Sequence, residues 1–94
     1  MSGTEIRIDR AFAERLFDEL RTRTADEPGV TRVAYGEGEQ FAHDMVRREA
    51  AALGLSEAVD AAGNLYVTLP GADSALPAWV VGSHLDSVPH GGNY

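Results

Sequence analysis

One short segment limits the possible folds of this chain more than any other. Residues 78–82 read Ala-Trp-Val-Val-Gly, so an extended chain here is apolar on both of its alternating faces. Such a strand is normally central in a sheet, with helices over both faces and other strands along both edges. We therefore expect an α/β fold with a buried strand over about 78–83, in which Trp79 packs in the core. Few of the 94 residues are left to cover that strand, which favours part of a larger α/β domain with an incomplete sheet.

The first helix is predicted from apolar spacing. Phe12, Leu16 and Leu20 recur at four-residue intervals, as on one face of an amphipathic helix. The helix should cover about 9–23, with Asp9 as its N-cap.

A second helix is expected over about 39–53. Residues 30–38 between the two helices read as an irregular connector, turn-like over 35–38. Gly54 stands where a helix commonly ends in the left-handed conformation.

The hydrophobic period then changes from about four residues to two. Residues 65–69 alternate between apolar and polar side chains, which predicts a strand with one buried face. The turn composition of residues 60–64 favours an antiparallel hairpin with residues 58–60.

Charge and composition exclude several classes of function. There are 8 basic against 15 acidic residues, and a net charge of −7 argues against nucleic acid and anionic membranes as partners. The absence of cysteine excludes disulfides and thiolate metal sites. No apolar run approaches the roughly 20 residues of a membrane span, and the first residues lack a secretory signal, so a cytoplasmic location is expected.

The chemistry is expected at the end of the apolar segment. His84 and Asp86 are two residues apart, so on an extended chain they face one way while Leu85 faces the core. A neutral imidazole is a common zinc ligand, and a carboxylate often accepts its second N–H. Spacing alone favours an ordinary structural His–Asp pair over a metal site, because motifs this short often match by chance.

Three sequence blocks then point to a family. Residues 82–94, with residues 29–35 and 60–65 in support, resemble the co-catalytic zinc amidohydrolases and metallopeptidases that include carboxypeptidase G and the aminoacylases. The similarity is greatest to the branch of N-carbamoyl-L-amino-acid hydrolases, allantoate amidohydrolases and β-ureidopropionases. This resemblance implies that residues 1–94 are the truncated N-terminal portion of a zinc-peptidase-like catalytic domain. The lid and dimerisation domain would be absent, and the parent would be a homodimer.

The resemblance also implies roles for two residues. His84 matches a ligand of one of two divalent ions, which would be zinc, with manganese or cobalt as alternatives, and Asp86 matches the catalytic aspartate that orients it. The implied reaction is hydrolysis of the amide or ureido C–N bond of N-carbamoyl amino acids or related ureido acids. In the family a bridging aspartate follows the residue that matches Tyr94, so we expect the isolated chain to be inactive.

Two other functions stay open. The chain could be a stand-alone, non-catalytic binding or dimerising protein, or part of an N-acyl amino-acid hydrolase or exopeptidase of the same wider family.

Four other positions carry simpler expectations. His43 is interpreted as a solvated surface residue of the second helix, and His90 as a loop residue that binds no metal. Arg32 is expected to be an exposed cation that forms a surface ion pair, with contact to an anionic substrate as the alternative. Residues 91–92, both glycine, are expected to let the chain turn sharply.

Overall fold

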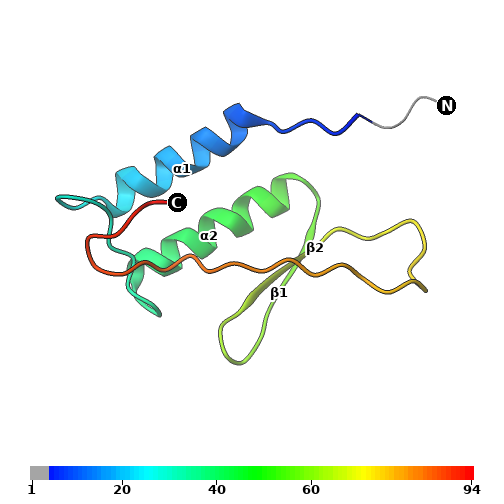
Figure 1. The fold of residues 1–94 in the computed structure, drawn as a ribbon. Helices are drawn as coiled ribbons and strands as arrows, with labels where there is room; N and C mark the ends of the chain where they lie inside the picture. The colour runs from blue at the N-terminus through cyan, green and yellow to red at the C-terminus, as the bar shows by residue number, and fades with distance from the viewer. Residues whose placement is uncertain (1–4) are drawn as a thin grey trace.

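Over residues 5–94 the fold consists of two helices followed by a β-hairpin and a long extended segment (Figure 1). The computed structural model describes residues 5–94. Its elements are α1 (Arg10–Thr24), α2 (Glu37–Ala52), β1 (Ser56–Val59) and β2 (Leu65–Thr68). Helix α2 contacts both α1 and the hairpin, and the extended segment passes along α2 before the chain returns toward α1 (Figure 1).

Helix α1 forms as its sequence predicts. The side chain of Asp9 accepts a hydrogen bond from the Phe12 N–H at 2.9 Å, which satisfies one of the free donors of the first turn. Arg21 and Arg23 lie in the last turn, where positive charge interacts favourably with the helix dipole.

Helix α2 begins two residues before the predicted start. Glu37 and Glu39 occupy its first turn, where negative charge is favourable, and the helix therefore includes residues expected to form a turn. The Glu39 carboxylate also reaches back to accept the Tyr35 N–H at 2.9 Å.

The end of α2 confirms the role predicted for Gly54. Its φ is +73°, in the left-handed region that favours glycine. The Gly54 N–H donates to the Ala51 carbonyl at 3.0 Å and the Leu55 N–H to the Ala50 carbonyl at 2.9 Å, the bonding pattern of a Schellman motif.

The antiparallel hairpin is confirmed, with β1 starting slightly earlier than expected. Val59 pairs with Leu65 and Ser56 with Thr68. Asp60 orders the turn, because its carboxylate accepts the backbone N–H groups of Ala62 and Asn64 at 3.0 and 2.9 Å. The expected buried face is missing, since Leu65 is half-buried and the rest of β2 is exposed.

The core is small and lies between the helices. Its buried members are Leu20, Ala42 and Met45. Four partly buried side chains pack against them: Leu16, Phe17, Phe41 and Leu85. Ion pairs link the helices at the rim, with Arg15 to Glu49 at 2.8 Å and Arg48 to Glu19 at 2.8 Å.

The prediction of a buried strand over 78–83 is wrong in this structure. The segment is extended but pairs with no strand among residues 5–94. Trp79, Val80 and Val81 are 98%, 84% and 95% exposed, so Trp79 does not pack in the core. Apolar character on two faces gives a strand only where neighbouring strands satisfy its backbone groups, and none of the described segments lies alongside to do so.

Candidate functional site

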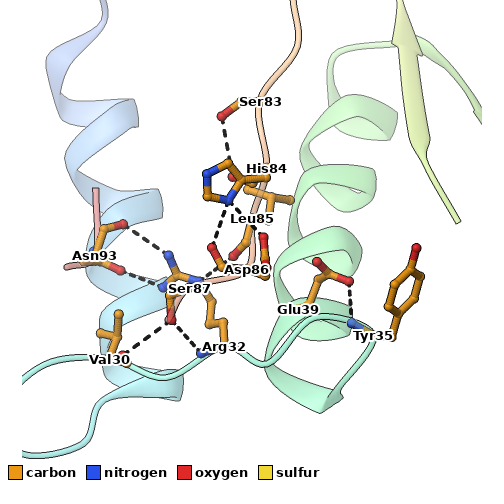
Figure 2. Close-up of polar contacts among 10 residues, drawn as sticks. All are labelled: Val30, Arg32, Tyr35, Glu39, Ser83, His84, Leu85, Asp86, Ser87 and Asn93. Atoms are coloured by element: carbon orange, nitrogen blue, oxygen red, sulfur yellow. Dashed lines mark hydrogen bonds and ion pairs between the residues drawn. The ribbon is translucent and has the colours of Figure 1, made fainter. Parts of the chain in front are cut away.

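His84 and Asp86 form a close pair at the end of the extended segment (Figure 2). The His84 Nδ1 lies 2.9 Å from Asp86 Oδ1 and 3.1 Å from the Asp86 carbonyl oxygen. Because both neighbours are acceptors, a neutral His84 carries its hydrogen on Nδ1 and keeps the lone pair of Nε2 free. The His84 side chain is 81% exposed, so Nε2 is open to a ligand.

Leu85 faces the other way, as the alternation predicts. Its side chain packs against the core cluster of Leu20, Ala42 and Met45. The apolar contact therefore anchors the residue between His84 and Asp86, and the polar pair projects away from the core.

The pair borders a pocket of about 540 Å³ between α2, the hairpin turn and the extended segment. Its polar lining includes Glu39 and His43 from α2 and Asn64 from the turn, together with His84 and Asp86. The prediction for His43 is therefore wrong: it is half-buried and lines the same pocket as His84, because its side of α2 faces the hairpin turn. Sequence spacing had placed it beside the exposed Asp44.

The prediction for Arg32 is also wrong, because this residue is 5% exposed. Its Nε donates to the Leu85 carbonyl at 2.7 Å, and its Nη1 donates to Thr24 Oγ1 at 3.2 Å and Asn93 Oδ1 at 2.9 Å. Burial lowers the pKa of the Arg32 guanidinium, and the negative charge of Asp86 opposes that effect. The guanidinium is thus engaged within the fold and is not free to bind a substrate anion.

The loop after Asp86 returns against the connector between the helices. Val30 and Gly91 exchange two backbone hydrogen bonds, of 3.0 and 2.9 Å. A Cβ atom on Gly91 would lie 2.9 Å from the Val88 carbonyl oxygen, so the turn requires glycine there, as predicted. Gly92 has open space around it and no such requirement.

His90 takes part in a second polar cluster at the far end of this loop. Its Nδ1 lies 3.0 Å from Asp26 Oδ2, and the same carboxylate accepts the Thr31 hydroxyl. The Thr31 hydrogen bond, and after it the His90 hydrogen bond, hold the pKa of Asp26 below its usual range, against the opposing effect of desolvation. The prediction that His90 binds no metal stays a prediction.

The donor atoms present do not make up a complete metal site. Among residues 5–94 no group of three or more His, Cys, Asp or Glu side chains is placed to hold a metal ion. A catalytic zinc site generally uses three protein ligands. His84 with Asp86 fits one ligand and the carboxylate that orients it, and no more.

Neither helix within residues 5–94 is long and apolar enough to cross a membrane.

Several known proteins with sequences similar to this chain are named as hydrolases or amidohydrolases. It is 34% identical over 93 residues to a ureidoglycolate hydrolase of Arabidopsis thaliana, covering 98% of this chain and 20% of the relative. It is 39% identical over 90 residues to an N-carbamoyl-L-amino-acid amidohydrolase of Paenarthrobacter aurescens, covering 93% and 22%. It is 38% identical over 66 residues to an allantoate amidohydrolase of Bacillus subtilis, covering 70% and 16%.

These matches cover most of this chain but only a small part of each relative. The chain spans about a fifth of the length of the curated relatives that it matches. No family model matches the chain, and no solved structure matches it.

Sequence reasoning missed the residues that hold the loop in place. Thr24 and Asn93 carry no chemical signal of their own, and their role depends on a buried Arg32. The one available hint was that Arg32 lies inside the block of residues 29–35, which already stood out as similar to other sequences.

Proposed function

This chain belongs to the family of hydrolases that includes the N-carbamoyl-L-amino-acid amidohydrolases, allantoate amidohydrolase and ureidoglycolate hydrolase. We propose that it contributes residues to the active site of a hydrolase of this kind. The proposed reaction is hydrolysis of the amide or ureido C–N bond of an N-carbamoyl amino acid or a related ureido acid. The observation that carries the proposal is similarity over 98% of the chain, a span that includes residues 84–86.

His84 and Asp86 have distinct roles in this proposal. Asp86 accepts the Nδ1 hydrogen of His84, which fixes the tautomer and turns the Nε2 lone pair outward. His84 then supplies one ligand to a divalent ion, for which zinc is the first candidate and manganese or cobalt are alternatives. Because one ligand does not make a site, we propose that the isolated 94-residue chain does not turn over substrate.

A chimeric enzyme tests the proposal. The matching segment of the Paenarthrobacter aurescens amidohydrolase would be replaced by this chain, and hydrolysis of N-carbamoyl amino acids would be measured together with bound metal. We expect activity in the chimera and its loss in His84→Ala, with less bound metal. The matched control is Arg21→Ala, an exposed residue on α1.

Two outcomes would contradict the proposal. One is a chimera that folds like the intact relative and hydrolyses nothing. The other is a His84→Ala chimera with full activity and full metal content. Turnover by the isolated chain above a metal-only control, lost in His84→Ala, would contradict its proposed inactivity.

A further inference from the structure

We infer that Arg32 is a positioning residue for the His84–Asp86 pair: from the connector before α2 it holds the main chain at Leu85 and at Asn93, and so fixes the loop between them. The inference rests on the proposed function for the role of the pair. The attachment itself is a property of this chain. Figure 2 shows the guanidinium of Arg32 between these points.

The backbone of Arg32 provides the first attachment. Its N–H donates to Ser87 Oγ at 2.8 Å, and the Ser87 N–H donates to the Arg32 carbonyl at 2.8 Å. Ser87 follows Asp86 directly, so the site segment is fixed to the connector immediately after the pair. The Val30–Gly91 bridge also holds the loop further along, independently of the Arg32 side chain.

The side chain of Arg32 provides the second attachment, within the pair itself. Its Nε donates at 2.7 Å to the carbonyl of Leu85, the residue between His84 and Asp86. The Leu85 side chain is held by the core, so both its carbonyl and its side chain are fixed. Rotation of this peptide would move the Asp86 carboxylate relative to the His84 ring, and the Arg32 hydrogen bond opposes that rotation.

The far end of the loop is attached through Asn93. Arg32 Nη1 donates to Asn93 Oδ1 at 2.9 Å and Nη2 to the Asn93 carbonyl at 3.2 Å. Asn93 in turn donates from Nδ2 to the Phe17 carbonyl of α1 at 2.9 Å. One guanidinium therefore links the beginning of the loop, its end and helix α1.

The chemistry of the contacts favours positioning over charge pairing. All four hydrogen bonds of the side chain go to uncharged oxygens: the carbonyls of Leu85 and Asn93, the Asn93 amide and the Thr24 hydroxyl. Five N–H donors in a rigid plane can hold several acceptors at fixed relative positions. A lysine ammonium retains the charge but cannot reproduce that geometry.

The test compares Arg32→Lys with the unchanged 94-residue chain, using Arg47→Lys as the matched control. Arg47 lies on the surface, where it pairs with Glu57 at 2.9 Å. Hydrogen exchange would be measured at the amides of Ser87 and Gly91, and long-range ¹H–¹⁵N spectra at about pH 8, above the ordinary imidazole pKa, would report the His84 tautomer.

We expect Arg32→Lys to raise exchange at Ser87 and Gly91 by about tenfold or more, as local opening becomes easier. The core amides of Leu20 and Met45 should change by less than about twofold, as expected for a local opening. The His84 signal should change from hydrogen on Nδ1 to a mixture of tautomers. Arg47→Lys should leave all three measurements unchanged.

The inference is overturned if Arg32→Lys leaves the tautomer unchanged, or raises exchange in the helices as much as in the loop. If Arg32→Lys does not fold, Asn93→Ala decides, because it removes one acceptor near the end of the chain. It should raise Gly91 exchange and weaken the tautomer preference, and an unchanged tautomer would overturn the inference. These measurements need no turnover, so an inactive chimera refutes the proposed function without affecting them.

Discussion

Two neighbouring regions of this molecule reverse the usual relation between polarity and burial. At the junction between connector and loop, Arg32 is 5% exposed and Val30 is 2% exposed. In the apolar segment that ends shortly before Leu85, Trp79 and Val81 are 98% and 95% exposed. Ranked by hydrophobicity, arginine should be outside and the Trp-Val-Val segment inside.

The difference shows that partners decide burial here. Arg32 is buried because four hydrogen bonds satisfy its side chain and two more pair its backbone with Ser87. Val81 is exposed because no strand in residues 5–94 pairs with its segment. A substitution should therefore lower the free energy of unfolding strongly at the junction around Arg32, where partners are lost. It should change it very little in the exposed segment around Val81.

A large effect is expected from Arg32→Met, which keeps the approximate length of the side chain and removes its donors. It leaves the Leu85 carbonyl and the Oδ1 atom of Asn93 without their Arg32 donors in a partly buried region. We expect the free energy of unfolding to fall by about 2–4 kcal/mol, measured by urea denaturation.

Arg21→Met is the matched control, since Arg21 is exposed and lies 3.6 Å from Asp18. It should change stability by less than about 0.5 kcal/mol. Equal effects of the two substitutions would show that the hydrogen bonds of the buried Arg32 side chain add nothing to stability beyond what a surface arginine contributes.

Local signals explain how much the sequence predicted. The Asp9 cap, the Gly54 helix end and the hairpin turn at Asp60 each depend on residues within a few positions, and all were predicted. Of the candidate site, the closeness of His84 and Asp86 followed from their spacing alone.

Long-range contacts explain what the sequence did not predict. Arg32 contacts Asn93 across 61 residues, and no periodicity reports such a contact. The burial of a strand depends equally on which segments lie beside it, so the apolar pattern of 78–82 could not by itself decide its exposure.

A smaller effect is expected from Gly29→Ala, which tests how closely the two backbones of the junction approach. A Cβ atom at Gly29 would lie well inside contact distance of the Gly91 carbonyl oxygen. We expect a loss of about 1–3 kcal/mol in the free energy of unfolding, because backbone would have to move. Gly71→Ala is the control, since nothing lies within 4 Å of a Cβ atom there, and it should be near neutral.

A pH titration combined with substitution of Glu49 tests the charged rim between the helices. Hydrogen bonds from Arg15 and then Arg48 hold the pKa of Glu49 below its ordinary value of 4.5. Folding thus favours the ionised carboxylate, so its contribution is complete above about pH 4.5 and is lost as the pH falls through the lowered pKa of the folded chain.

The urea midpoint should therefore fall on acidification below pH 4.5, and Glu49→Gln should flatten part of that fall. The change should be smaller than for Gly29→Ala, because exposed ion pairs contribute little. Glu14→Gln is the control, on an exposed pair with Arg10 at 3.5 Å. A midpoint that rises on acidification would contradict the sign.

The smallest effect on stability is expected in the apolar but exposed segment of residues 78–82. Val81→Asp places a charge on a side chain that is 95% exposed, so it should change the free energy of unfolding by less than about 0.5 kcal/mol. It should also reduce concentration-dependent self-association in sedimentation, because an apolar extended segment with unpaired backbone groups tends to associate.

Val30→Asp is the matched substitution at a side chain that is 2% exposed, where an unpaired buried charge should destabilise the fold by several kcal/mol. Since both substitutions change valine to aspartate, the difference between their effects on the free energy of unfolding reports the difference in burial between the two positions. If Val81→Asp costs more than about 1 kcal/mol, a value typical of core positions, the segment is covered in solution and the contrast with the Arg32 junction fails.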